Sequence, residues 1–502
     1  MAEYIAQQVS VVNGSNAVII ESGESPEVVR QGDFLFITGS DPVGINRTYI
    51  NSNSQHVIEL SKNWSNGNKS NQPAIVLPTT VEFKSAAAAL KNANLLVNDN
   101  FVAMQDWQTK TGTVTFVNID GTTTTVKTLK QIESEASEAT TAAMSAVETR
   151  AQTAYREAVE AASSGKNTVK YDAQGNPNVM VWIPKFNSED VNQAIIDRHG
   201  VDLQLGTGVF PAFIKNGVQM RGFWYAKYIA SAGENGGCSV ISGVQPRTSV
   251  NYDTAKSLCT NKGTGWHLSA NIEWLAVAYL GLAFGEQPRG DTNYGRAHDA
   301  KHEVATRASA THAPGDTGHS SPSYTGTGPA TWSHDGTQFG VFDMVGNVWE
   351  WQDQLKLQEG QIFAPIDNNP DMLEGDWPAH ECYFDSSGES GGSVILNSLI
   401  TNRTGDIGDN GSGNGSNSTT WRTMAKDPSY VENLLMRKMG IEPPPDAILN
   451  GNLYSRNFGE RLPFRGGNWG NTSSAGLGAL YFNYSRTSAS GSIGFRPALF
   501  ES

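Results

Sequence analysis

The stretch FRGGNWGNTSSAGLGALYFNYSRTSASGSIGFRPAL, residues 464–499, decides the fold of the C-terminal part of the chain. It opens with the motif Arg465-Gly466-Gly467 and closes with Gly494-Phe495-Arg496-Pro497. Between them the residues are mostly Ser, Gly, Asn, Thr and Tyr, and Arg486 is the only charged one. We interpret the two motifs as structural anchors that hold a compositionally narrow segment between them.

The segment between the anchors combines a buried frame with replaceable contacts. Apolar residues should lie beneath its surface: Leu477, Leu480, Phe482, Ile493 and Phe495. Tyr, Ser, Gly and Asn dominate antibody paratopes, where Tyr gives contact area at low entropic cost. The alternation of Ser over residues 487–492 suits an extended segment with every second side chain outward. We therefore expect one exposed ligand-binding surface, made of Asn468, Gly470, Asn471, Gly478, Tyr481, Asn483, Tyr484, Thr487, Ala489 and Gly491. A low-complexity loop is the alternative.

Residues 470–492 also show a genetic regularity. They contain no Lys, Glu, Gln, Met or Trp. An asparagine codon in which only the adenines are replaced encodes Gly, Ser, Thr, Ala, Tyr and Asn, but none of those missing residues. The composition thus predicts a segment diversified at its asparagine codons.

Composition limits what the whole chain does. Its 502 residues predict two to four structural units. A charged fraction of 17% with 52 glycines favours β- and loop-rich structure. The net charge of −14 argues against nucleic-acid binding, and no apolar run is long enough for membrane insertion. Three cysteines make no disulfide framework, and the first ten residues lack signal-peptide features, so we expect synthesis in a host cytoplasm.

Residues 1–128 should form a β-rich attachment domain. Two apolar runs flank Asn13-Gly14, a strong hairpin pattern. Further apolar runs continue the strand pattern, while the Ala-rich residues 83–107 predict a helix. We find no catalytic constellation in this part of the chain.

Residues 129–163 predict a helical neck. No Pro or Gly interrupts them, and a coiled-coil spacing of three and four residues links Leu129, Ile132, Ala136, Ala139 and Ala143. We expect this neck to join copies of the chain into a homotrimer. A lone amphipathic helix packed on a neighbouring domain is the alternative, because Ala is a weak seam residue.

Residues 164–502 carry sequence blocks that resemble a known family. The blocks include VMVWIPKF, GTGWHLSANIEWLAVA, DMVGNVWEW and the two anchor motifs. Together, over about residues 178–499, they resemble the sulfatase-modifying, formylglycine-generating family, which implies a C-type-lectin-like fold. More narrowly, residues 464–499 resemble the variable region of proteins diversified by retroelements, among them phage tail-fibre heads. The expected fold class is therefore multidomain α+β, with a β-rich N-terminal domain, a coiled-coil neck and a C-type-lectin-like domain at 164–502.

The block at residues 343–351 has two interpretations. In a strand, Trp349 and Trp351 would face one side and Glu350 the other. Two buried indoles with bonded N–H groups suffice to explain it. The resemblance instead implies a structural Ca²⁺ site, with oxygen ligands from Asp343, Gly346, Val348 and Glu350.

The family resemblance also raises an enzymatic alternative. Formylglycine generation implies two nearby cysteines after the first anchor motif, yet residues 464–502 contain none. Related sulfoxide synthases imply a histidine-rich metal site. His298 and His302 would share a helix face if their segment were helical, but nearby Gly and Pro favour a solvated loop. We therefore expect a binding protein with no certain cofactor, and the metalloenzyme stays an alternative.

Taken together, these features predict a receptor-binding tail-fibre-type protein located in a virion. Its C-terminal surface would bind a host cell-surface receptor, either protein or glycan. Its N-terminal domain would bind other tail or virion proteins. A cellular surface-displayed variable binding protein is a further alternative.

Overall fold

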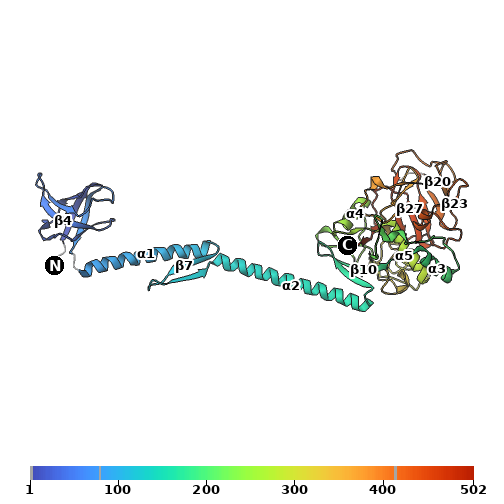
Figure 1. Cartoon of the computed structure of the whole chain (residues 1–502), viewed down its shortest axis with the longest axis horizontal. Coiled ribbons are helices and arrows are strands. Elements are labelled where there is room, and N and C mark those ends of the chain that lie inside the picture. The colour runs from blue at the N-terminus through green and yellow to red at the C-terminus, as the bar shows by residue number, and fades with distance from the viewer. Residues whose placement is uncertain (1–3, 79–80, 286, 412–414, 502) are drawn as a thin grey trace. The chain divides into compact units, whose positions relative to one another are not determined.

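The structure is a computed structural model that describes residues 4–78, 81–285, 287–411 and 415–501 (Figure 1). The chain divides into two compact units, residues 1–146 and 147–502, which we describe separately. Both units mix helices and strands, so the predicted α+β class is confirmed. The three-part division at residues 128 and 163 remains a prediction, since the unit boundary falls inside a helix. No helix among the described residues has the length and apolarity needed to cross a membrane.

The first unit begins with a closed antiparallel barrel, drawn in dark blue in Figure 1. Its strands β1 (Tyr4–Val11) and β2 (Ala17–Ser22) form the predicted hairpin around Asn13-Gly14, where Gly14 adopts a left-handed φ of +85°. Fifteen buried side chains fill the barrel, including the indole of Trp64, which donates to the carbonyl of Gly67 at 2.6 Å. In barrel order the strands are β1 (Tyr4–Val11), β2 (Ala17–Ser22), β5 (His56–Leu60), β4 (Val43–Ile50), β3 (Phe34–Ile37) and β6 (Lys69–Leu77).

The Ala-rich segment forms helix α1 (Val81–Thr109), which confirms the predicted helix. It packs on a two-stranded hairpin of β7 (Thr113–Val117) and β8 (Thr123–Lys127). The Asn100 side chain bonds both backbone groups of Val117, at 2.9 and 3.0 Å. The Trp107 indole donates to the carbonyl of Lys127 at 3.0 Å.

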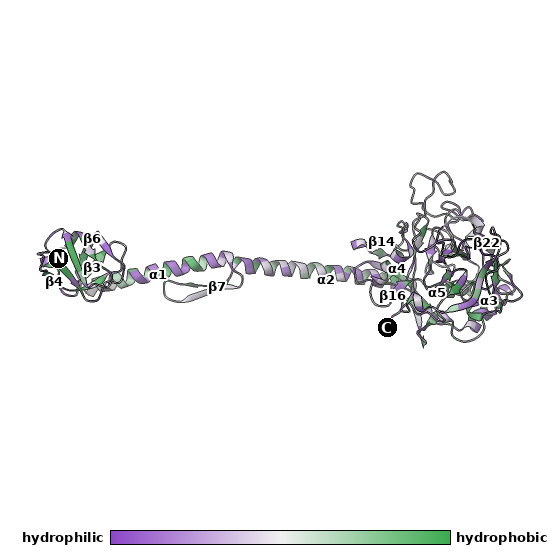
Figure 2. Ribbon diagram, turned by 90° about the horizontal axis from the view of Figure 1, so that it is seen from above, coloured by the Kyte–Doolittle hydropathy of each residue, from purple (hydrophilic) through white to green (hydrophobic). Residues whose placement is uncertain are grey.

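Helix α2 (Leu129–Ser163) begins after Thr128, whose hydroxyl accepts from the Gln131 N–H at 3.3 Å. The predicted helix over residues 129–163 is therefore present, and Ser163 is its one buried residue. Figure 2 shows that hydrophilic and hydrophobic residues alternate along both long helices. Near its end, the Ser163 hydroxyl accepts from the Asn167 N–H at 2.9 Å.

The second unit is built on three sheets, with short helices α3, α4 and α5 beside them (Figure 1). The first sheet, in order, is β16 (Trp266–Leu268), β29 (Pro497–Leu499), β13 (Gly222–Ala226), β10 (Pro177–Pro184) and β9 (Asn167–Tyr171). The second is β22 (Asn417–Thr420), β24 (Asn452–Ser455), β27 (Gly476–Phe482), β26 (Phe464–Gly466), β17 (Trp349–Trp351) and β28 (Ile493–Phe495). The third is β23 (Ala425–Lys426), β21 (Val394–Asn397), β20 (Ala379–Ser386), β19 (Gln361–Phe363), β18 (Lys356–Gln358) and β25 (Glu460–Arg461).

Short elements complete the second unit. Its helices are α3 (Ser188–His199), α4 (Tyr252–Thr260), α5 (Asn271–Phe284) and α6 (Leu434–Lys438), and its small ribbons are β11 (Ile214–Lys215) with β12 (Val218–Gln219) and β14 (Ser231–Ala232) with β15 (Cys238–Ser239). Helix α5 is buried around almost its whole circumference. Such a helix is hydrophobic on all sides because it lies inside the core. Its Trp274 indole donates to the carbonyl of Leu477 at 3.1 Å, which fixes β27 against the helix.

Candidate binding surface

The scaffold of the predicted binding segment is strand β27, an inner strand of the second sheet. It pairs in parallel with β24 and antiparallel with β26. Side chains on one face join the main core, while Ala479 and Tyr481 face a second cluster around Trp349 and Trp351. The predicted burial of the frame is confirmed for Leu477, Leu480, Phe482, Ile493 and Phe495.

The first anchor motif holds β26 through a fully buried guanidinium. Arg465 donates to the Asn271 side chain at 2.8 Å and to the carbonyl of Met439 at 2.9 Å. Burial lowers the pKa of Arg465 to about 9. The following Gly466 has φ of +92°, and an added Cβ would lie 2.7 Å from the Met344 carbonyl oxygen, so only glycine fits this turn.

The second anchor motif holds the sheet through a buried ion pair. Arg496 binds both carboxylate oxygens of Glu350, at 2.8 and 2.9 Å, and both side chains are almost fully buried. It also donates to the carbonyls of Ala226 and Phe342, each at 2.9 Å. Burial alone would lower the pKa of Arg496, but the charge and hydrogen bonds of Glu350, with smaller contributions from Tyr225 and Asp343, together raise it. The predicted arrangement of the block is confirmed, since Trp349 and Trp351 share one cluster and Glu350 points away from it.

Both carboxylates expected to bind Ca²⁺ have partners within the protein. Glu350 is neutralised by Arg496, which binds both of its oxygens. Burial raises the pKa of Asp343 to about 6, and its carboxylate accepts from the Gly326 N–H at 2.8 Å. Gly346 and Val348 would contribute carbonyl oxygens, and that part of the Ca²⁺ site stays a prediction. Among the described residues, no three His, Cys, Asp or Glu side chains lie close enough to hold a metal ion.

Two exposed loops flank β27, and they carry most of the predicted contact positions. The first loop, residues 468–474, leads into the strand, and the second loop, residues 485–492, leads out of it to β28. Gly470 in the first loop and Thr487, Ala489 and Gly491 in the second are exposed. The expected extended alternation over residues 487–492 is wrong, because two turns replace the strand and three consecutive residues, 489–491, are exposed.

Asparagines shape the first loop. The Asn468 side chain accepts from the Gly470 N–H at 2.9 Å, and the Asn471 side chain accepts from the Asn468 N–H at 2.7 Å. Both asparagines are half-buried. Such local side-chain to backbone bonds define tight turns, so these residues set the loop's shape as well as lining its surface.

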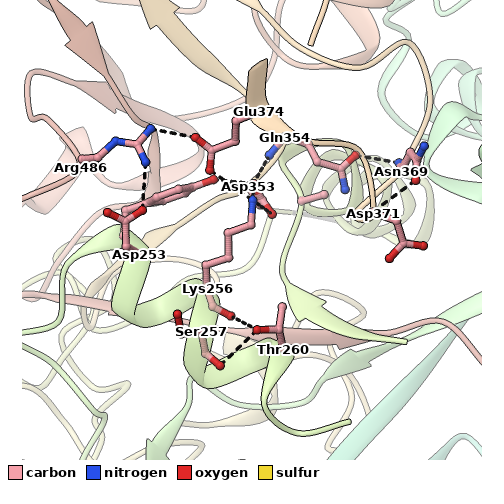
Figure 3. Close-up of polar contacts among 12 residues, drawn as sticks. Asp253, Lys256, Ser257, Thr260, Asp353, Gln354, Asn369, Asp371, Glu374 and Arg486 are labelled. Carbon is pink, nitrogen blue, oxygen red and sulfur yellow. Dashed lines mark hydrogen bonds and ion pairs between the residues drawn. The ribbon is translucent and has the colours of Figure 1, made fainter. Parts of the chain in front are cut away.

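The second loop is held at its base by Arg486. This side chain binds both oxygens of Glu460, at 2.7 and 2.8 Å, and one oxygen of Glu374 at 2.8 Å. It also reaches Asp253 at 3.0 Å, and its carbonyl accepts from the Tyr252 N–H at 3.2 Å. Figure 3 shows the guanidinium between Glu374 and Asp253. The only charged residue between the two anchor motifs is therefore a structural tether and not a free contact.

Lys256 extends the same network towards the core. It bridges Asp353 and Glu374 at 3.1 and 3.3 Å (Figure 3). Burial would lower its pKa, but the two carboxylates outweigh that effect and raise it. Glu374 therefore binds both Arg486 and Lys256, and Lys256 links it to the buried carboxylate of Asp353.

The two loops meet at a cleft of about 590 Å³. The first loop contributes Trp469, and the second contributes Ser490, Gly491 and Ser492. The opposite walls carry mainly small polar side chains, from Gln245, Thr248, Ala308, Ser309, His319, Ser320, Ser321 and Pro322. A second cavity, of about 290 Å³, reaches the segment only at Ala475, Gly476 and Leu477, which are buried. The larger cleft is thus the one bordered by exposed loop residues.

Four predicted contact residues lie outside the two loops, either in β27 or directly after it. The expected exposure is wrong for Gly478, which is buried and would place an added Cβ 2.9 Å from the Leu449 Cβ. It is also wrong for Asn483, which is 3% exposed and donates to the Ser416 hydroxyl at 2.7 Å. Gly478 lies in β27, an inner strand of the second sheet, and Asn483 directly follows the end of that strand.

Tyr481 and Tyr484 are half-buried and not freely exposed. Their rings stack on each other at 5.5 Å, and Tyr481 also stacks on Phe464 at 5.8 Å. Burial raises the pKa of Tyr481. Each ring is therefore partly packed against the core. The composition of the segment had predicted that both rings are exposed.

Sequence reasoning missed most of the cleft. Trp469 lies directly between Asn468 and Gly470, so a lone Trp among small residues was an available indication. The alternating pattern predicted Ala489 and Gly491 as contacts, but not Ser490 and Ser492. The walls at residues 245–248 and 308–322 are distant in sequence, and nothing in their composition marks them.

The other chemical groups considered from the sequence are inaccessible or lie in loops. All three cysteines, Cys238, Cys259 and Cys382, are free and buried. Burial raises the pKa of each thiol, to about 12 for Cys382. The segment of His298 and His302 is a loop, as the nearby Gly and Pro predicted, and His298 bonds the Thr292 hydroxyl at 2.9 Å.

Comparison with known proteins matches the second unit to one family. A model of the sulfatase-modifying factor enzyme 1-like domain matches residues 186–499. The expected family resemblance is therefore confirmed. No curated protein sequence matches the chain.

Several solved structures resemble the chain at low identity. The Major Tropism Determinant U1 variant is 13% identical with a TM-score of 0.24, over 64% of this chain and 63% of that protein. PvdO from Pseudomonas aeruginosa is 14% identical with a TM-score of 0.27, over 66% and 98%. Treponema denticola variable protein 1 is 11% identical with a TM-score of 0.25, again over 66% and 98%. The chain thus spans less than two thirds of the U1 variant.

Proposed function

This chain belongs to the family of sulfatase-modifying factor enzyme 1-like domains, with a C-type-lectin-like fold, and from that premise we propose that its second unit is a binding domain and not an enzyme. The ligand is a protein or glycan on a host cell surface. The binding surface comprises the first loop, the second loop and the cleft between them. Fold alone does not carry function, so the proposal rests on the site.

The observation that carries the proposal is the convergence of both loops on one cleft. Its volume of about 590 Å³ lies within the range of small-ligand sites. Backbone bonds hold the loops in place: the Ser249 N–H donates to the Ser490 carbonyl at 2.9 Å, and the Tyr294 N–H donates to the Trp469 carbonyl at 2.7 Å. Because such bonds do not depend on loop side chains, contact residues other than Asn468 and Asn471 can change while these two backbone contacts stay in place.

The burial of all three cysteines supports a non-enzymatic role. Thiol chemistry requires the thiolate, and burial raises the pKa of Cys238, Cys259 and Cys382. All three are also shielded from a macromolecular substrate. The formylglycine-generating alternative therefore lacks a reactive thiol on this chain's surface.

We further propose that the protein is a tail-fibre-type component of a phage virion. The N-terminal barrel would attach to other tail or virion proteins. Helix α2 would form a coiled-coil neck that joins copies into a homotrimer through Leu129, Ile132 and the alanines that follow; Leu129 and Ile132 are 40% and 47% exposed. Three copies would hold a repetitive cell surface by avidity even when each head binds weakly. A cellular surface-displayed variable protein is the competing assignment.

Cell binding by the purified full chain tests the proposal. Fluorescently labelled protein is mixed with a panel of bacterial isolates, with and without protease or periodate treatment of the cells. The Ser490→Trp variant fills the cleft and should lose binding at an unchanged melting temperature. The Ser390→Trp variant is the matched control, because it changes an exposed serine of the same unit outside the cleft.

Three results would contradict the proposal. One is equal binding by both tryptophan variants, and another is binding to no isolate. The third is copper-dependent oxidation of a cysteine-containing sulfatase peptide by the purified protein. Loss of binding after periodate identifies a glycan, and loss after protease identifies a protein ligand.

A further inference from the structure

Helix α1 exposes an unusual amount of apolar surface. Six large apolar side chains on it are between 51% and 72% exposed: Leu90, Leu95, Val97, Phe101, Val102 and Met104. Monomeric proteins rarely leave contiguous apolar patches of more than a few hundred Å² in water. Full burial of a Val, Leu, Phe or Met side chain contributes about 1.5–3 kcal/mol, so leaving six such side chains in water forgoes a large stabilisation.

The exposed residues follow a coiled-coil spacing. Leu90, Asn94, Val97, Phe101 and Met104 are separated by four, three, four and three residues. This is the seam of a left-handed coiled coil, with a single polar residue inside it. Leu95 and Val102 directly follow Asn94 and Phe101 in sequence, so they lie about 100° around the helix from them and form a separate exposed apolar row.

The chain's own hairpin covers a different face of α1. Asn100, Ala103 and Trp107 lie on that face, where Asn100 and Trp107 bond the β7–β8 hairpin and Ala103 is buried. The seam residues keep their large exposed fractions despite this packing. Helix α1 therefore has one face that is already partnered and one that is not.

We propose that the seam of α1 binds the same seam on further copies of this chain, as a parallel, in-register coiled coil. A coiled-coil seam is self-complementary, so a second copy supplies a surface of matching period. Four large seam side chains, Leu90, Val97, Phe101 and Met104, are 55% to 72% exposed, and each would gain about 1.5–3 kcal/mol on full burial against another copy.

Asn94 sets both register and direction. A single Asn in an apolar seam pairs with its counterpart, because any other register buries its amide against apolar groups. An antiparallel pair centred on Asn94 would place Phe101 opposite Ala87, two seam positions of unequal size. The parallel pair places Phe101 on Phe101 and Val97 on Val97.

This inference goes beyond the neck proposed for α2 and concerns a separate segment. The α2 seam continues through Ala136, Ala139 and Ala143, which bury little area. A Leu or Phe side chain gains about 1.5–3 kcal/mol on full burial, far more than an alanine methyl. Helix α1 would therefore provide the larger share of the association.

Sedimentation of the full chain at micromolar concentration tests association. The wild type should be oligomeric, and Val97→Glu with Phe101→Glu should be a monomer or a weaker oligomer, because the seam would bury like charges. Ile119→Glu is the control, since Ile119 is 96% exposed in the same unit but lies in the β7–β8 connection, away from the seam. It should sediment as wild type.

Disulfide cross-linking tests register and does not depend on a destabilising charge. Asn94→Cys should form a covalent dimer under mild oxidation, while Asn92→Cys, exposed on the opposite side of the helix from the seam, should not. The three native cysteines are buried and free, so they do not confuse the result. A monomeric wild type, or equal cross-linking of both variants, overturns the inference. An oligomer that survives the double glutamate variant, with no cross-link at position 94, also overturns it but leaves the α2 neck standing.

Discussion

Removing the charge of Arg496 should strongly destabilise the second unit. The Arg496→Met variant keeps most of the side-chain volume but deletes the guanidinium that binds Glu350, Ala226 and Phe342. Glu350 would then be a carboxylate that is 1% exposed and has no counter-charge. Breaking a buried pair in this way costs about 3–5 kcal/mol, a large fraction of a typical stability of 5–15 kcal/mol.

Urea unfolding followed by tryptophan fluorescence measures this loss, because Trp349 and Trp351 lie on either side of Glu350 in the sequence. Combining Arg496→Met with Glu350→Gln should cost less than Arg496→Met alone, since no buried charge is left over. A chelator should leave the wild-type unfolding curve unchanged, because Arg496 and not a cation neutralises Glu350. A loss below about 1 kcal/mol, or a chelator effect as large as the mutation, would refute this account of the pair.

Three further outcomes are expected. Leu480→Ala, at a site with 0% exposure, should lower unfolding free energy by about 2–5 kcal/mol while the folded protein keeps its ligand specificity, as urea unfolding and cell binding would show. Arg486→Gln should cost about 1–2 kcal/mol and make the second loop a site of rapid proteolysis, because Glu460 loses its partner; unchanged cleavage would contradict the tether. Burial raises the pKa of Asp291 from 3.8 to about 7, so the folded state binds this proton more tightly than the unfolded state. The free energy of unfolding of the wild type therefore falls as pH rises through that interval. The unfolding free energy of Asp291→Asn relative to wild type should therefore rise by up to about 4 kcal/mol between pH 4 and pH 8, and a flat difference would disprove the shift.

Local patterns predicted local structure well. The Asn13-Gly14 hairpin, helix α1 and helix α2 each depend on neighbouring residues, and each is present. The buried frame of the binding segment was also predictable, because large apolar side chains among small polar ones have few alternatives to the core.

Long-range pairing was not predictable in the same way. Arg496 meets Glu350 across 146 residues, and Arg486 meets Asp253 across 233. Neither partner is marked by local spacing. The burial of Gly478 and Asn483 was not predictable for a related reason. Composition does not show that β27 is an inner strand covered on both faces, or that Asn483 bonds Ser416, 67 residues away.

The surroundings of Gly491 have an evolutionary consequence. An added Cβ at this position meets nothing within 4 Å, whereas one at Gly478 would press on Leu449. New side chains at the loop tip therefore cost little folding stability, and a lineage can change what it recognises without a compensating substitution elsewhere. Proteins lie close to the stability threshold that selection enforces. Confining change to positions such as Gly491 keeps a lineage above that threshold while the proposed binding surface changes.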